Sequence, residues 1–183
     1  VLTPIGIDHA CYLGDTLEEI AFQKAGIIKN ECYVISAKQD ERVMEIITKT
    51  CKEKGATLKI ADVFNAVHVR YGLEKQRFTY GELEKLVISL GGKYQIENAV
   101  LAVETIKALQ RNGYHITEKI LRRGLMEAKW RGRFTVISRR PLFIVDGAHN
   151  EEAVQKLKES VTFYFTNKRI ITIIGVLRDK EYE

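Results

Sequence analysis

The stretch that decides the fold class is residues 6–29, GIDHACYLGDTLEEIAFQKAGIIK. It follows the apolar segment VLTPI, which is typical of a buried strand, and it continues into an amphipathic run that predicts a helix. Thr16 and Glu19 form a capping-box pattern at the start of this helix, and Gly26 is placed to end it. A strand, a loop and a helix in this order indicate an α/β fold.

Strands and helices go on alternating along the chain, which predicts an α/β fold with a largely parallel sheet. Residues 66–71 and 76–80 alternate apolar and polar side chains, so we expect them to be antiparallel strands with one exposed face. The remaining expected strands are residues 33–37, 57–61, 134–138, 142–145 and 170–174, and the remaining expected helices are residues 41–54, 95–112, 117–129 and 151–163.

Two domains are expected to meet near Gly132, because the pattern of strands and helices restarts after this glycine. Residues 1–132 and 133–183 are therefore interpreted as parts of separate domains. Val1 lies inside a strand-like segment, and the last residues come just after another one. Neither end has the pattern of a domain boundary, which favours an internal fragment of a longer protein.

Composition excludes several classes of protein. With 183 residues and 45% apolar content the chain can bury a core, and its net charge of +5 is spread among 24 acidic residues without an aromatic-rich basic stripe. The three cysteines form no CxxC pair, which argues against a disulfide framework and a structural zinc site. No apolar run reaches the ~20 residues of a membrane span. We expect a cytoplasmic protein that binds neither nucleic acid nor membranes.

His9 and Lys24 are the first candidates for chemistry. His9 follows the first strand, where α/β sheets bind ligands, and its imidazole is a metal ligand. The alternative for His9 is a histidine that caps its own strand. A lysine inside a helix, such as Lys24, is ordinarily a solvated surface residue.

Asn98 lies in a second motif, GGKYQIENAVLA, at residues 91–102. Its amide offers both a donor and an acceptor, which suits the edge of an adenine ring. The alternative is an ordinary helix entry, in which glycines precede an amphipathic helix.

A third motif combines WRGRF, residues 130–134, with DGAHN, residues 146–150. Arg133 suits phosphate recognition through its charge and fork geometry. Asp146 and His149 follow an apolar strand, and the alternative for them is a simple Asp-Gly turn.

Taken together and in this order, the three motifs resemble those of folylpolyglutamate synthase and dihydrofolate synthase, which belong to the Mur-ligase superfamily. That family carries G-[IL]-D-H, E-K-A-G-I-I-K, G-x-H-Q-x-x-N-A, W-P-G-R and D-G-A-H-N. This chain departs from the family pattern at four positions, namely Gln23, Tyr94, Arg131 and Glu151.

The resemblance implies a role for each candidate residue. His9 would bind Mg²⁺, and Lys24, carbamylated by CO₂, would ligate a second metal ion through oxygen, so these two residues would be catalytic. Three residues would bind ATP: Asn98 at the adenine, Arg133 at the nucleotide and Asp146 at the ribose. His149 would meet the incoming glutamate.

The resemblance also implies the fold and the function. Residues 1–132 would be the C-terminal portion of a mostly parallel ATP-binding domain, and residues 133–183 the beginning of a smaller, Rossmann-like glutamate-ligase domain. The protein would be a monomer. It would act as a ligase that uses ATP to add L-glutamate to folate, to dihydropteroate or to both, through an acyl phosphate. No G-x-x-x-x-G-K-[ST] phosphate loop occurs in the sequence, so we expect little activity from these residues alone. The alternatives are another Mur-type amino-acid ligase, a non-catalytic nucleotide- or folate-binding module, and, with only its basic charge in favour, an RNA-binding domain.

Overall fold

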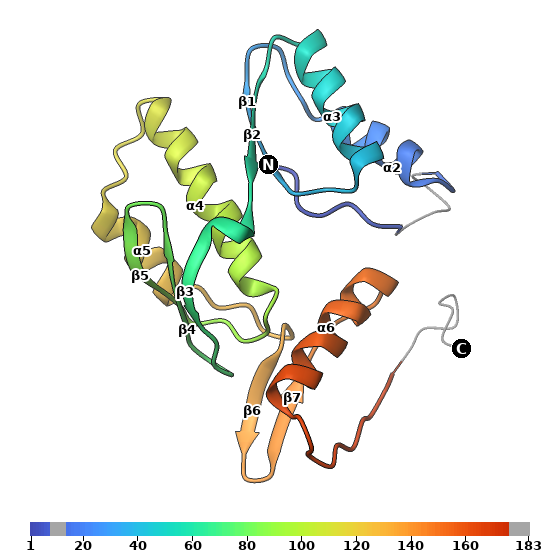
Figure 1. Cartoon of the computed structure of the whole chain (residues 1–183), viewed down its shortest axis with the longest axis vertical. Helices are drawn as coiled ribbons and strands as arrows, with labels where there is room; N and C mark the ends of the chain where they lie inside the picture. Colours follow the sequence, from blue (N-terminus) through green and yellow to red (C-terminus); the bar gives the residue numbers. More distant parts are fainter. Residues whose placement is uncertain (8–13, 176–183) are drawn as a thin grey trace.

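The computed structural model describes residues 1–7 and 14–175. Their helices and strands form an α/β arrangement around three small sheets (Figure 1). In chain order the elements are α2 (Leu17–Ala25), β1 (Tyr33–Ala37), α3 (Glu41–Glu53), β2 (Thr57–Ala61), the short 3₁₀ helix η1 (Val63–Asn65), β3 (Ala66–Arg70), β4 (Gln76–Tyr80), β5 (Leu83–Ile88), α4 (Gln95–Arg111), α5 (Glu118–Glu127), β6 (Thr135–Arg139), β7 (Leu142–Val145) and α6 (Glu151–Tyr164).

The parallel part of the fold is built on β1 and β2. These strands pair in parallel from Tyr33 opposite Thr57 to Ala37 opposite Ala61, and Leu2 adds a parallel bridge to Ser36. Neighbouring side chains of a strand point to opposite faces of its sheet. Accordingly Val34 packs in the cluster formed with α2 and α3, whereas the next residue, Ile35, packs in the cluster formed with α4. The parallel sheet expected from the sequence is therefore covered by helices on both faces.

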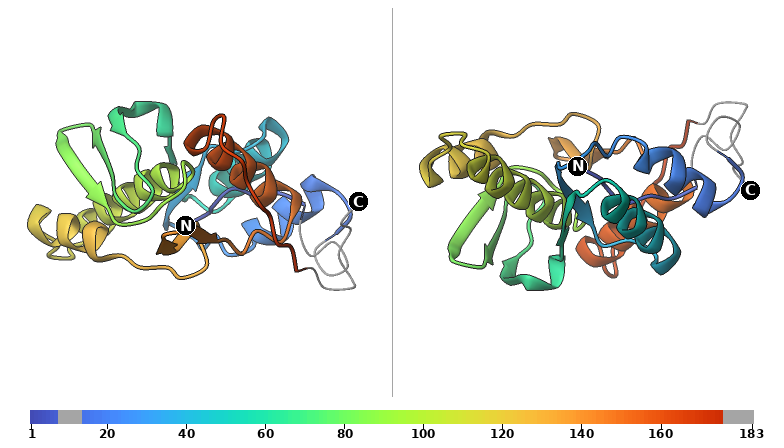
Figure 2. Two further views of the ribbon diagram at one scale, coloured as in Figure 1. Left: turned by 90° about the horizontal axis from the view of Figure 1, so that it is seen from below. Right: turned by 90° about the horizontal axis from the view of Figure 1, so that it is seen from above.

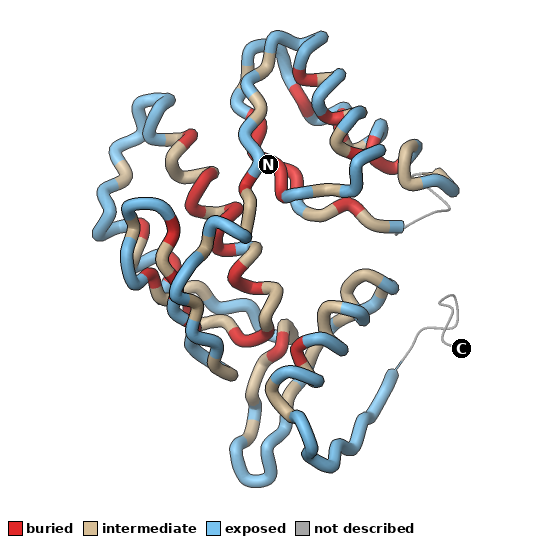
Figure 3. The backbone as a smooth tube through the Cα atoms, viewed as in Figure 1, coloured by how far each residue is buried: buried red, intermediate tan, exposed pale blue. Residues whose placement is uncertain are grey.

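An antiparallel sheet of β3, β4 and β5 lies against α4. The antiparallel pairing of β3 with β4 confirms the prediction for residues 66–80, and β5 is an additional strand. Phe78 and Leu86 from this sheet are fully buried with Val100 and Val103 of α4. Figure 2 shows α5 on the side of α4 away from α2 and α3, and in Figure 3 buried residues run along most of α4. This helix is thus the centre of the larger core.

The last elements are the β6–β7 hairpin and α6, which come together beside the start of α4 (Figure 1). The strand expected at residues 170–174 is absent from the structure. Ile171, Ile173 and Ile174 are 83%, 81% and 76% exposed there. A strand needs a hydrogen-bonded neighbour, and this segment has none among the described residues, so its apolar composition alone does not make it a strand.

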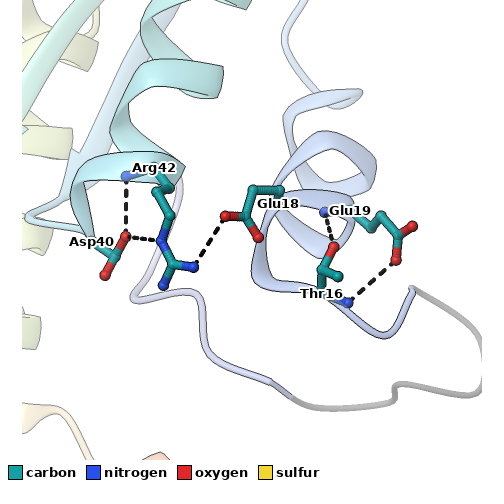
Figure 4. A network of polar contacts seen from close by, with 5 residues as sticks. All are labelled: Thr16, Glu18, Glu19, Asp40 and Arg42. Carbon is teal, nitrogen blue, oxygen red and sulfur yellow. Dashed lines mark hydrogen bonds and ion pairs between the residues drawn. The ribbon is translucent and has the colours of Figure 1, made fainter.

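The capping box predicted at the start of α2 is confirmed. Thr16 Oγ1 accepts a hydrogen bond from the Glu19 amide at 3.2 Å, and Glu19 Oε2 accepts one from the Thr16 amide at 3.3 Å. Figure 4 shows a neighbouring bridge, in which Arg42 at the start of α3 donates to Glu18 and to Asp40. The starts of α2 and α3 are therefore tied to each other.

Replacing Thr16 with alanine is expected to lower the free energy of unfolding by about 1 kcal/mol, because the Glu19 amide loses the hydroxyl that caps it. Urea denaturation followed by circular dichroism measures the change. Thr48→Ala, at an exposed position inside α3, is the matched control and should not destabilise the protein, since alanine is the better helix former. Equal destabilisation by both substitutions would contradict the role of the cap.

No helix in the described ranges is long and apolar enough to cross a membrane.

Candidate functional site

Asp146, directly after β7, is the centre of the polar contacts between the C-terminal elements and α4. Its Oδ2 atom accepts a hydrogen bond from the Tyr94 hydroxyl at 2.9 Å and another from the Phe134 amide at 2.7 Å. Its Oδ1 atom accepts one from the Ala148 amide at 2.8 Å, which closes a turn over the DGAHN segment. One carboxylate thus joins three segments that are distant in the sequence.

The WRGR and DGAHN segments are also paired through their backbones. The Gly147 amide donates to the Gly132 carbonyl at 2.7 Å, and the Arg133 guanidinium donates to the Gly147 carbonyl at 3.0 Å. Gly132 has a φ of 76°, a left-handed conformation that glycine adopts at little cost. The hairpin therefore holds Arg133 beside the turn that carries Asp146.

Phe134, the residue after Arg133, has an unusual backbone conformation. Its φ is 45°, which is rare for a bulky side chain and costs on the order of 1–3 kcal/mol. Its ring is only 1% exposed and packs 5.4 Å from the ring of Tyr164 on α6. Burial of the ring and the hydrogen bond to Asp146 together maintain this conformation.

Tyr94 immediately precedes α4 and is half-buried. Burial raises the pKa of its hydroxyl above the ordinary value of tyrosine, and the adjacent Asp146 carboxylate raises this pKa further. The hydroxyl therefore stays protonated at neutral pH and remains a hydrogen-bond donor to Asp146.

Two further contacts hold the start of α4 against α6. The Lys93 amide donates to Oγ of Ser160, which is fully buried, at 3.1 Å, and Lys156 forms an ion pair with Glu97 at 2.7 Å. Just before this helix, Gly91 packs so closely that a Cβ would overlap the Leu73 carbonyl oxygen and lie 2.9 Å from that of Phe134. The junction is closed by backbone as well as by side chains.

Asn98 is exposed near the start of α4. Its Nδ2 donates to the side chain of Gln95 at 3.0 Å. Asn98 therefore lies at the same end of α4 as Tyr94, whose hydroxyl donates to Asp146.

His149 and Asn150 complete the DGAHN turn. Nδ1 of His149 lies 2.9 Å from the Gly147 carbonyl oxygen, and the His149 side chain is exposed. The Asn150 side chain accepts a hydrogen bond from the Ala153 amide at 2.8 Å and caps α6. The turn thus has a structural purpose, as the alternative interpretation of this motif required, and it also gathers Asp146 and His149 next to Arg133.

Of the two expected metal ligands, the structure describes only Lys24. His9 lies outside the described residues. Lys24 lies half-buried in the last turn of α2. Gly6, which leads toward His9, lies against α6, since a Cβ on Gly6 would be 3.4 Å from Cβ of Glu152. The segment before His9 therefore runs beside the helix that follows DGAHN.

The described residues do not by themselves form a site for Mg²⁺. They contain no group of three or more histidine, cysteine, aspartate or glutamate side chains arranged to hold a metal ion. The amine of Lys24 is a cation in its unmodified form and would repel one. One surface cavity, of about 610 Å³, is lined by the end of α2, the loop after it and the end of α3. Another, of about 590 Å³, is lined by residues of β5 and α5, and no candidate site residue lines either of them.

Comparisons with known proteins agree with this arrangement of motifs. Residues 132–183 match the family described as Mur ligase, glutamate ligase domain. The whole chain is 35% identical to a dihydrofolate synthase/folylpolyglutamate synthase of Bacillus subtilis and 31% identical to a folylpolyglutamate synthase of Lacticaseibacillus casei, and it spans 44% of the length of each. A solved folylpolyglutamate synthase in complex with AMPPCP and folate superposes with a TM-score of 0.85 at 28% identity, covering 91% of this chain and 42% of the other.

The chain is similar over its whole length to folylpolyglutamate synthases and dihydrofolate synthases.

The fold of this chain, like that of these solved structures, agrees with the α/β class predicted from the sequence. The sequence interpretation missed two residues at the junction, Tyr94 and Ser160. Tyr94 stands where the family pattern has a histidine, and a ring with a polar end at a helix start is a signal of a polar contact. Ser160 gave no signal, because a serine inside an amphipathic helix is ordinarily exposed.

Proposed function

We propose that the protein is an ATP-dependent ligase that joins L-glutamate to a folate, to dihydropteroate or to both. The observation that carries this proposal is the cluster of Arg133, Asp146 and His149 against the start of α4. This cluster occurs in a chain that is similar over its whole length to ligases of this kind. The same proposal includes the domain boundary at residue 132, with residues 1–132 in the ATP-binding domain and 133–183 in the glutamate-ligase domain.

The proposed reaction has two steps. A carboxylate oxygen of the pteroate or folate attacks the γ-phosphorus of ATP, so that the bond to the β-phosphate oxygen breaks and ADP leaves. The product is an acyl phosphate, whose phosphate is a good leaving group. The amine of L-glutamate then attacks the acyl carbon, inorganic phosphate leaves, and the amine gives up a proton as the amide forms.

Four residues of this chain would bind and orient the reactants. The guanidinium of Arg133 has five N–H donors, and its contact with Gly147 uses one of them, so it retains donors for a phosphate. Asp146 would accept a hydrogen bond from the ribose, and the amide of Asn98 would face the adenine. His149, exposed beside them, would meet the L-glutamate.

Mg²⁺ at His9 and at a carbamylated Lys24 remains a prediction. Bound at these residues, the ion would supply positive charge that stabilises the phosphate as it is transferred. A cytoplasmic location and a monomeric state remain predictions as well.

Incorporation of radiolabelled L-glutamate by the whole protein tests the proposed function. The assay contains Mg-ATP and either dihydropteroate or tetrahydrofolate. Labelling of dihydropteroate alone would identify a dihydrofolate synthase, labelling of tetrahydrofolate alone a folylpolyglutamate synthase, and labelling of both a bifunctional enzyme. Labelling of neither substrate by a protein that folds would overturn the proposal and favour another Mur-type amino-acid ligase.

A further inference from the structure

The hydrogen bonds of Asp146 leave it little capacity for a ligand. A carboxylate has about four acceptor positions, two on each oxygen. Tyr94 and Phe134 occupy both positions on Oδ2, and Ala148 occupies one position on Oδ1. Counting donors from the described part of the chain, one acceptor position remains, and it is on Oδ1.

Two of these three donors are fixed by the backbone. The Ala148 amide belongs to the turn that Asp146 itself begins. The Phe134 amide reaches Oδ2 from a residue with positive φ whose ring is buried, so its direction is set by packing. Tyr94 is the only one of the three that donates through a side chain, and its donor can be removed without altering the backbone.

We propose that Tyr94 is a positioning residue that restricts Asp146 to one ribose hydroxyl of the bound nucleotide. Its hydroxyl fills the second acceptor position of Oδ2, which would otherwise be open to the other hydroxyl of the ribose. The carboxylate then binds the ribose through Oδ1 alone. This inference rests on the proposed nucleotide-binding role of Asp146 and adds to it the residue that determines how the ribose is recognised.

Dissociation constants of ATP, 2′-deoxy-ATP and 3′-deoxy-ATP test the proposal on the whole protein. For the wild type, one deoxy analogue should bind as tightly as ATP and the other about tenfold more weakly, since one hydrogen bond to a carboxylate is lost. For Tyr94→Phe, the previously silent hydroxyl should gain a partner on Oδ2. Both analogues should then bind several-fold more weakly than ATP.

Tyr164→Phe is the matched control. The Tyr164 hydroxyl also forms a hydrogen bond across this junction, to the Gly72 carbonyl at 3.2 Å, but it does not contact Asp146. Loss of this hydroxyl should leave the ratios among the three dissociation constants as they are in the wild type. A thermal denaturation curve for each variant separates a loss of folded protein from a change in recognition.

The outcomes separate this proposal from the proposed function. If both hydroxyls contribute in the wild type, or if Tyr94→Phe weakens all three nucleotides by the same factor, the restriction by Tyr94 is wrong while nucleotide binding stands. If the folded wild type binds no ATP, the proposed function fails and the role of Tyr94 fails with it.

Discussion

Lys24→Ala is expected to lower glutamate incorporation by more than about 100-fold, the scale on which an enzyme loses kcat when one charge-stabilising group is removed. The physical reason is that carbamylation changes the sign of the charge on the Lys24 side chain. Carbamylation by CO₂ converts the Lys24 ammonium into an anion whose oxygens can ligate a hard cation, and alanine can provide neither the charge nor the oxygens. The measurement is the radiolabelled L-glutamate assay with Mg-ATP and the preferred folate substrate.

Lys52→Ala is the matched control for this substitution. Lys52 lies in the last turn of α3, as Lys24 lies in the last turn of α2, and its side chain is exposed. Its loss should leave the rate unchanged. A direct readout is the mass of the intact wild-type protein under CO₂, which should increase by one CO₂ molecule and should not increase for Lys24→Ala. Full activity of Lys24→Ala would contradict the predicted role of a carbamylated Lys24.

Asp146→Ala is expected to lower the free energy of unfolding by about 3 kcal/mol, in addition to weakening nucleotide binding. The substitution removes the acceptor of three hydrogen bonds at a half-buried position and leaves the amides of Phe134 and Ala148 without that partner. It also removes one of the contacts that keep Phe134 in its costly conformation. Urea denaturation provides the measurement.

Asp62→Ala is the comparison for this stability change. Asp62 is also half-buried, but as the cap at the start of η1 its side chain accepts a single amide hydrogen bond, from Phe64 at 2.9 Å. Its loss should destabilise the protein much less than the loss of Asp146. If the two substitutions cost the same free energy, Asp146 does not join the three segments in the way described.

Local signals in the sequence predicted those elements whose causes are local. The strands β1 and β2 have the predicted bounds because each is a short apolar run between polar residues, and α2 begins where its capping box is. In contrast, β5 was not predicted, because Glu84 and Lys85 interrupt its apolar pattern. The strand is also irregular in the structure, where Lys85 has a φ of 54°. The prediction of a strand at residues 170–174 was wrong, because a strand depends on a hydrogen-bonded neighbouring strand that its own residues do not specify.

The site follows the same division. Asp146 and Arg133 could be identified from their motifs, because each motif is contiguous in the sequence. The Tyr94–Asp146 hydrogen bond could not, since it joins residues 52 positions apart and depends on how α4 meets the β6–β7 hairpin. His9 and Lys24 remain predictions, and the former lies outside the described residues.

Gly91 allows close packing at the start of α4, because a Cβ at this position would overlap the carbonyl oxygen of Leu73 and lie 2.9 Å from that of Phe134. A methyl group at this position would act as a spacer that pushes first against the β3–β4 connection at Leu73 and then against Phe134, although it replaces no hydrogen-bonding side chain around Asp146. Replacing Gly91 in turn with alanine and with valine would therefore increase the separation of these segments in steps. The dependence of the proposed nucleotide binding on the packing of the junction could then be measured without replacing any of its polar side chains.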